Sequence, residues 1–379
     1  MIYFDNAATT IKPPCVIEAV STALATLTNA NRGVNTSSMC ANRAIYETRN
    51  KLAKMFNVSS PTLVIFTSGA TQSLNMAILG TLKKGDHVIT TNLEHNSVLR
   101  PLYYMKKKGV NLSIIKCNNN YTIDIDAVLS HIKSNTKMLV ISHASNTLGV
   151  VQNLEHIGRI CKEYSIKLVV DAAQTAGIIS IDMQKMNIDA LCLSAHKSLL
   201  APQGLGILAL SKNININPIS FGGTGTHTFE QTMNIGLPES LEAGTQNGHA
   251  IVGLSAALDY INEHKIEKLY NKAHDLAKYF EQELAKIPNV IIYTNQSVLS
   301  TPVVTFNVMG SSAVDISFLL SKDYDIITRA GGLCAPLVHH MLDTTDKGII
   351  RFSFSHNNTK QEVDIALEAL KIILSKGVT

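Results

Sequence analysis

Several features that would assign the sequence to whole classes of protein are missing from it. Among its 379 residues there is no Trp, and only 16% are charged. No run of Lys and Arg with interleaved aromatic residues occurs, which argues against nucleic-acid binding. No apolar run reaches the ~18 residues that a membrane span needs, and residues 1–14 lack the basic and apolar regions of a secretory signal. We therefore expect a cytoplasmic protein that binds neither nucleic acid nor a membrane.

A pattern of paired cysteines is also missing. The six cysteines are scattered and form no CxxC motif, so we interpret them as free thiols in a reducing compartment. No metal site is predicted from them. They are Cys15, Cys40, Cys117, Cys161, Cys192 and Cys334.

What the sequence does contain is an alternation of strand-like and helix-like segments. Hydrophobic residues make up 45% of the chain, which is enough for a large core. Strand-like segments such as 62–69, 136–145 and 166–174 are apolar almost throughout, which predicts a mostly parallel sheet covered by helices on both faces. The later segments predict a smaller α+β region. We expect an α/β fold with a large domain over residues 1–245 and a small domain over residues 246–379.

Two charged residues follow apolar strands. Lys197 lies close to Ser194 and His196, and a lysine that leaves a buried strand can lose solvation, which lowers its pKa and makes it a Schiff-base former. A solvated lysine is the alternative. Asp171 ends another strand, where it could pair with a protonated ring nitrogen or cap the next helix. Gln174, one helical turn on, could donate to a ring hydroxyl or face solvent.

The segment FTSGATQSLN predicts a strand that runs into a helix. Free backbone N–H groups at a helix start favour a phosphate, and Thr71 could add its hydroxyl; ordinary capping by Ser68 or Thr71 is the alternative. No GxGxxG lies between a strand and a helix, which argues against a dinucleotide.

His95 could stack on a flat cofactor or move protons, or it could be a surface residue. Asn146 could bond a cofactor or form a turn.

Two further residues lie in the last part of the chain. Arg351 sits within an apolar strand and needs a carboxylate partner, from a substrate or from the protein itself. Cys334, in RAGGLCAPLVHH, could be a small buried hydrophobe, a reactive thiol on a Gly-rich loop, or a zinc ligand together with His339 and His340.

In chain order, these segments resemble the fold-type I pyridoxal-phosphate enzymes, specifically the class V aminotransferase superfamily. YFDNAATT, EHN, VDAAQ, SAHK followed by GxGIL, EAGTQN and RxGGLCAP match in order over nearly the whole chain. The RxGxxCAP loop is similar to that of the cysteine desulfurases and selenocysteine lyases. The sixteen residues 335–350 between Cys334 and Arg351 make this loop compact, as in group II of that branch.

The resemblance implies pyridoxal phosphate as the cofactor and gives each candidate residue a role. Lys197 would bind the cofactor covalently and move protons, Asp171 would keep the ring nitrogen protonated, and Gln174 would contact the ring hydroxyl. His95 would stack on the ring and take part in proton transfer. The phosphate would be held by the backbone of Ala70, by Thr71, Ser194 and His196, and by Thr245 of a neighbouring subunit, which implies a homodimer.

The resemblance also implies an activity. Arg351 would bind the substrate carboxylate, and Asn146 would lie near that carboxylate or the ring hydroxyl. Cys334 would take the sulfur of L-cysteine as a persulfide and leave alanine, and a sulfur-acceptor protein would then receive the sulfur. The alternatives are a selenocysteine lyase that acts on L-selenocysteine, another C–S or C–Se lyase, an aminotransferase, and a non-catalytic protein that kept the fold, against which Lys197 argues.

The sequence departs from these relatives at two positions. Leu333 stands directly before Cys334, where related loops often carry His, and this could alter thiolate formation or the choice between sulfur and selenium. Asn35 follows the Arg32–Gly33 pair, where group II members carry His, and this affects the expected contact with an acceptor protein.

Overall fold

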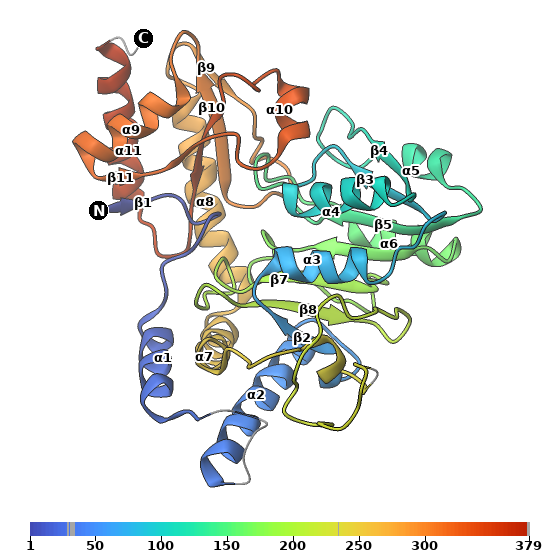
Figure 1. The fold of residues 1–379 in the computed structure, drawn as a ribbon. Coiled ribbons are helices and arrows are strands. Elements are labelled where there is room, and N and C mark those ends of the chain that lie inside the picture. The colour runs from blue at the N-terminus through green and yellow to red at the C-terminus, as the bar shows by residue number, and fades with distance from the viewer. Residues whose placement is uncertain (29, 31–34, 234, 377–379) are drawn as a thin grey trace.

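A seven-stranded sheet forms the centre of the larger part of the molecule (Figure 1). The computed structural model describes residues 1–28, 30, 35–233 and 235–376. The strand order is β2-β8-β7-β6-β5-β3-β4; β8 is antiparallel to β2 and β7, and the other neighbours are parallel. The strands are β2 (Val64–Thr67), β3 (His87–Thr91), β4 (Asn111–Ile115), β5 (Thr136–Ser142), β6 (Lys167–Asp171), β7 (Ala190–Ser194) and β8 (Gly206–Leu210).

Helices cover both faces of this sheet. On β5, Leu139 and Ile141 belong to a core with residues of α2, α5, α6 and α7, whereas Met138 and Val140 belong to a second core with residues of α3 and α4. A strand that is buried on both faces must be apolar at every position, which explains the continuous apolar segments of the sequence. These helices are α2 (Thr36–Met55), α3 (Ala70–Leu79), α4 (Asn96–Lys107), α5 (Ile125–His131), α6 (Leu154–Glu163) and α7 (Gly248–His264).

A smaller antiparallel sheet, with strand order β12-β13-β10-β9, carries the C-terminal part of the chain. Its core includes Phe280 of α8 and Phe352 of β13, whose rings stack with centroids 4.5 Å apart. The elements here are β9 (Val290–Ile292), β10 (Val303–Val308), β11 (Ile326–Ile327), β12 (Arg329–Gly331), β13 (Ile349–Ser353), α8 (Ile266–Leu284), α9 (Ala313–Tyr324), α10 (Pro336–Leu342) and α11 (Lys360–Ser375).

The start of the chain reaches into this small-sheet part. Strand β1 (Ile2–Tyr3) pairs in parallel with β11, and Phe4 is fully buried among the aromatic residues of the small-sheet core. Figure 1 shows both termini on that side of the molecule, with α1 (Pro14–Thr26) then leading to the large part. Helix α7 packs on α1 and α2 and contributes to the large-sheet core. A residue from before position 245 thus belongs to the small-sheet core, and a helix from after it belongs to the large-sheet core. The expected domain boundary after residue 245 stays a prediction.

The architecture confirms the predicted α/β fold, with a large mostly parallel sheet and a smaller α+β part. None of the helices in the described ranges combines the length and the apolar character that crossing a membrane requires.

Candidate active site

A cavity of about 300 Å³ opens at the carboxyl ends of the parallel strands. These ends lie at one edge of the sheet, so residues far apart in sequence meet there. The cavity is lined by nine of the predicted site residues: Ala70, Thr71, His95, Asn146, Asp171, Gln174, Ser194, His196 and Lys197. Thr245 is exposed and does not line it.

One wall of the cavity is the amino end of α3. Gly69 precedes this helix, and no side chain of the described residues caps it, so the capping alternative for Ser68 and Thr71 is wrong. The strand β8 passes close by: a Cβ on Gly206 would lie 2.4 Å from the backbone of Gly69. The open N–H groups of the first helical turn, with their share of the helix dipole, favour an anion in the cavity.

Asp171 also lines the cavity. Its Oδ1 accepts a hydrogen bond from the backbone N–H of Ala173 at 2.9 Å, and its Oδ2 lies 3.5 Å from the Ser97 hydroxyl, which donates to it. Residues 172–189 form turns rather than a helix, so Asp171 caps a turn and not a helix. Gln174 donates from Nε2 to the carbonyl of Ala7 at 3.2 Å, which ties the N-terminal segment to the cavity.

His95 is half-buried at the amino end of α4, and it is not the surface residue of the alternative interpretation. Its Nδ1 accepts the backbone N–H of Ser97 at 3.0 Å. Because Nδ1 accepts, the proton of the neutral ring is on Nε2. Burial lowers the pKa of His95, an effect that Asp171 partly opposes. The imidazole is therefore neutral at pH 7.

Lys197 follows β7 at the same edge of the sheet. Burial is the largest effect on Lys197 and lowers its pKa to about 8. Among the smaller effects, the charge of Asp171 raises this pKa and that of Arg351 lowers it, and Asp5 and Cys334 raise it further. The neutral amine, which is the nucleophilic form, is thus accessible near neutral pH. The solvated-lysine alternative does not describe this environment.

His196 lies beside that lysine. Burial, and then the charges of Lys197 and Lys12, lower the pKa of His196 to about 4. Its buried Nδ1 has no hydrogen-bond partner among the described residues. A buried polar atom without a partner costs free energy unless a ligand satisfies it, so His196 is available to an anion in the cavity.

The loop that carries Cys334 is docked beside His95. The Cys334 carbonyl accepts the backbone N–H of Asn96 at 2.8 Å, and the Leu333 carbonyl accepts Nδ2 of Asn146 at 2.7 Å. Leu333 and Cys334 both have left-handed backbone, with φ of 44° and 58°, which is unfavourable for residues with a Cβ. The Cys334 side chain is exposed, so the buried-hydrophobe alternative is wrong.

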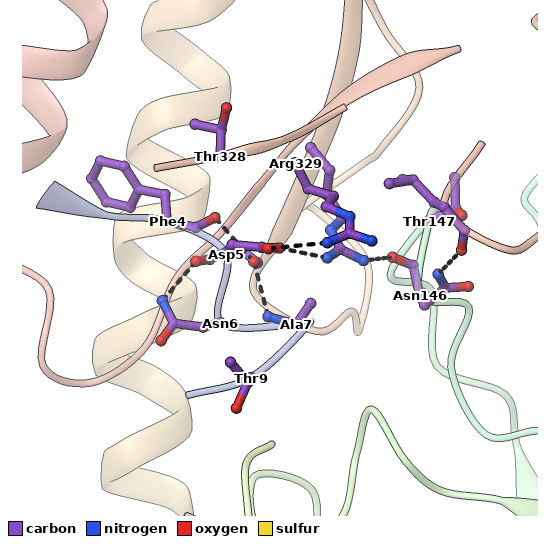
Figure 2. A network of polar contacts seen from close by, with 12 residues as sticks. Phe4, Asp5, Asn6, Ala7, Thr9, Asn146, Thr147, Thr328 and Arg329 are labelled. Carbon is purple, nitrogen blue, oxygen red and sulfur yellow. Dashed lines mark hydrogen bonds and ion pairs between the residues drawn. The ribbon is translucent and has the colours of Figure 1, made fainter. Parts of the chain in front are cut away.

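Arg351 is buried on β13 and has a protein carboxylate as its partner. Its Nη2 lies 2.8 Å from Oδ1 of Asp5, and its Nη1 donates to the carbonyl of Asn146 at 3.1 Å. Figure 2 shows Asp5 on the N-terminal segment, with two guanidinium groups on the same side of it, one of which is that of Arg329. Within the described part of the chain, Nε of Arg351 and Oδ1 of Asn146 are buried and unpartnered.

Sequence reasoning missed three residues next to the candidate site. Asp5 pairs with Arg351, Ser97 bonds both His95 and Asp171, and Glu94 is fully buried beside Ser142. The signals for them were indirect: Asp5 and Glu94 lie inside YFDNAATT and EHN, the segments that carry the family resemblance. Asn35 caps α2 by accepting the N–H of Ser38, and the Arg32–Gly33 pair before it lies outside the described residues.

Known proteins are similar in sequence to this chain over nearly its whole length. The sequence model of the family described as "Aminotransferase class-V" matches residues 2–366. A probable cysteine desulfurase of Synechocystis sp. is 32% identical, and the match covers 98% of this chain and 90% of the relative. One of Pyrococcus abyssi is 33% identical, with 98% and 94% covered.

Solved structures are similar over almost the whole chain. The apo structure of a cysteine desulfurase from Thermococcus onnurineus NA1 has a TM-score of 0.91 and 31% identity, with 99% of this chain and 95% of that chain covered. The cysteine desulfurase CsdA from Escherichia coli has a TM-score of 0.89 and 28% identity, with the same coverage. The chain belongs to the class V aminotransferase family. Within that family it lies on the cysteine desulfurase branch, which confirms the resemblance predicted from the sequence.

Proposed function

We propose that the protein is a pyridoxal-phosphate-dependent cysteine desulfurase, which converts L-cysteine into L-alanine and takes the sulfur onto Cys334. The observation that carries the proposal is the meeting of Lys197 and Asp171 in one cavity with the docked loop of an exposed Cys334 beside it. The cysteine desulfurases among the relatives support the same activity.

The residues of the cavity fit pyridoxal phosphate. The uncapped start of α3, Thr71, Ser194 and the unpartnered Nδ1 of His196 suit a phosphate. Lys197 offers an amine of lowered pKa to an aldehyde, and Asp171 offers a carboxylate to a protonated ring nitrogen. When bound, this cofactor supplies an electron sink that stabilises negative charge at the α-carbon of an amino acid.

Lys197 and His95 are the residues that take part in proton transfer. The Lys197 amine has a pKa of about 8, so near neutral pH it can take a proton from one atom of the substrate and return it to another. His95 is neutral, with its proton on Nε2 and its Nδ1 fixed by Ser97. This tautomer allows the Nε2–H group to donate a hydrogen bond to a ligand in the cavity.

Arg351 and Asn146 are the residues that bind the substrate. The unpartnered Nε of Arg351 is a charge-assisted donor for an amino-acid carboxylate. Asn146 touches both this arginine and the loop of Cys334 through its backbone carbonyl and its side chain.

Sulfur transfer falls to Cys334. Its thiolate forms an S–S bond with the sulfur of L-cysteine while the C–S bond of the substrate breaks. The electron pair of the broken bond remains on carbon, which gains a proton and becomes the methyl group of alanine. The sum is L-cysteine plus the Cys334 thiol giving L-alanine plus a Cys334 persulfide, and an exposed loop can then present the sulfur to an acceptor protein.

The test uses protein reconstituted with pyridoxal phosphate and supplied with L-cysteine, with and without a reductant. We expect alanine, and a mass increase of one sulfur atom on the intact protein that is absent in Cys334→Ala. Pyruvate and sulfide as products, or no product until L-selenocysteine is supplied, would identify a lyase instead. Activity that requires a keto acid would identify an aminotransferase.

We also propose that the protein works as a cytoplasmic homodimer. Thr245 is exposed and lies away from its own cavity, as expected if it completes the phosphate site of a second copy. Phe221 and Phe229, which precede it, are 75% and 99% exposed, and such apolar side chains suit a face that a partner covers.

A further inference from the structure

A carboxylate of the protein itself occupies one edge of the arginine that the proposed function assigns to the substrate. Oδ1 of Asp5 lies 2.8 Å from Nη2 of Arg351, and the two side chains are only 10% and 4% exposed. Oδ2 of the same carboxylate lies 3.9 Å from Nη1 of Arg329, which is 56% exposed. Figure 2 shows that Asp5 comes from the N-terminal segment and Arg329 from the edge of the small sheet.

These contacts use two of the three nitrogen atoms of the Arg351 guanidinium group. Nη2 is taken by Asp5 and Nη1 donates to the Asn146 carbonyl, whereas Nε is buried without a partner among the described residues. Asn146 lines the cavity, and its Oδ1 is also buried and unpartnered within the same described part of the chain. The guanidinium is planar and rigid, so contacts on two of its nitrogens determine where the third points.

The charges of the group also suit one ligand carboxylate. Two guanidinium groups share one carboxylate, so the three side chains carry a net charge of one positive unit. A buried arginine without any counter-ion would be strongly destabilising, and Asp5 prevents this when no substrate is bound. One unit of positive charge remains for an amino-acid carboxylate.

The N-terminal segment does not depend on Asp5 for its own attachment. The backbone of Phe4 accepts the N–H of Ser353 at 2.7 Å, and the N–H of Ala7 donates to the Ser353 hydroxyl at 2.9 Å. The ring of Phe4 is fully buried against Phe352 and Phe354. The carboxylate of Asp5 is therefore free for a role other than anchoring the chain.

We infer that Asp5 is a positioning residue for substrate recognition: it holds the guanidinium of Arg351 so that Nε faces the carboxylate of the bound amino acid, and it makes the N-terminal segment part of the substrate site. The inference rests on the proposed function, because that function assigns a carboxylate ligand to Arg351. A residue that acts in this way affects the carboxylate of a ligand and not its amino group.

The test compares two ligands that share an amino group but differ at the carboxylate. L-Alanine and L-alaninamide are titrated into the cofactor-loaded enzyme, and binding is followed by the change in cofactor absorbance. Wild type is expected to prefer L-alanine. In Asp5→Ala this preference falls about 10- to 100-fold, the range for losing an oriented hydrogen bond to a charged group, while affinity for L-alaninamide stays the same. Asp5→Asn, which keeps an oxygen acceptor for Nη2, is expected to fall between the two.

A matched control is Asp189→Asn. Asp189 is another buried aspartate that pairs with a cation, Lys167 at 3.3 Å, but it lies just before the amino end of β7. Its loss is expected to lower the melting temperature without changing the preference for L-alanine. If Asp5→Ala does not fold, Asp5→Asn gives the same comparison.

Two results would overturn the inference, and neither depends on turnover. One is an unchanged preference for L-alanine in the Asp5 variants; the other is a wild type that binds both ligands equally, which would remove Arg351 as a carboxylate site. Failure of the proposed function has a separate signature, because wild type would then form no alanine from L-cysteine whatever its preference between the two ligands.

Discussion

The protonation state of Glu94 could not be predicted from the sequence pattern. Its carboxyl group is fully buried and accepts hydrogen bonds from the hydroxyls of Thr91 at 2.6 Å and Ser142 at 2.8 Å. Burial raises the pKa of Glu94 to about 8, an effect that these hydroxyls oppose and the charge of Asp171 reinforces. The side chain directly before His95 is thus a neutral acid at pH 7.

Glu94 is expected to make stability depend on pH. Its pKa rises from 4.5 to about 8 on folding, so between these values the folded state holds a proton that the unfolded state has lost. The free energy of unfolding therefore falls with rising pH across this window, by up to about 1.4 kcal/mol per pH unit from this one group. Glu94→Gln cannot titrate, so its stability relative to wild type should grow between pH 5.5 and 8 in urea unfolding.

The control for that measurement is Glu155→Gln. Glu155 is partly exposed and pairs with Lys185 at the surface, so the difference in its unfolding free energy from wild type should stay constant over the same pH range. Parallel curves for wild type and Glu94→Gln would mean that Glu94 is ionised in the folded protein.

Residues at strand ends could be predicted from the sequence, and residues that depend on a distant partner could not. Lys197 and Asp171 follow continuous apolar strands, and that local pattern places them at the ligand-binding edge of a sheet. The role of Asp5 depends on Arg351, 346 positions away, and no local pattern connects the two. Arg351 itself was predicted to need a carboxylate, and the protein supplies one where the sequence left the source open.

At the scale of elements, the position of the uncapped start of α3 depends on how closely β8 approaches it. Gly206 begins β8, and its missing side chain lets the backbone of Gly69 lie against the strand. Had Gly206 carried a Cβ, the start of α3 and the strand could not lie this close together. The position of the first turn of this helix thus depends on a residue 136 positions later on a different element.

Gly206→Ala is expected to weaken cofactor binding through the phosphate. The added Cβ would lie 2.4 Å from Gly69, so α3 must shift, at a cost of about 1–3 kcal/mol in stability. The affinity of the apoprotein for pyridoxal phosphate should fall by more than its affinity for pyridoxal, which lacks the phosphate, as measured by absorbance titration.

Gly222→Ala provides the comparison for this substitution. A Cβ at Gly222 would meet only the Ala243 side chain at an ordinary 3.7 Å, and we expect both affinities to remain as in wild type. An equal loss for pyridoxal phosphate and pyridoxal in Gly206→Ala would refute the phosphate-specific effect.

The two helices that follow residue 246 pack in different cores. Residues 248–264 form α7 and residues 266–284 form α8. Ala250, Ile251 and Leu254 of α7 lie in the large-sheet core, whereas Phe280 of α8 lies in the small-sheet core. Apolar spacing shows that a helix has a buried face, but it does not show which sheet that face will cover.

At the scale of the whole molecule, the proposed dimer would share its sites between subunits. Lys197 lines the cavity of its own chain, whereas Thr245 is exposed outside it. If Thr245 serves the partner's cavity, each subunit supplies a lysine to one site and a threonine to the other.

Mixed dimers test this arrangement. Lys197→Ala should be inactive and Thr245→Ala should bind pyridoxal phosphate about tenfold more weakly, as expected for one lost hydrogen bond to a charged group. When the two variants are mixed and allowed to exchange subunits at limiting cofactor, one site of each mixed dimer carries both wild-type residues. Up to about a quarter of wild-type alanine formation should return. No gain over the sum of the separate variants would place Thr245 with its own chain, or would mean that the protein is a monomer.

The attachment of the first residues to the small sheet has a consequence for how the protein is made on the ribosome. During translation Asp5 emerges well before its partner Arg351, which lies 346 positions further along the chain, and before Ser353. The large sheet, complete by residue 210, can assemble while the chain is still growing, because domains form from the amino end as they emerge. The N-terminal segment must meanwhile remain without these partners, so the part of the candidate site that contains Asp5 and Arg351 forms after the large sheet.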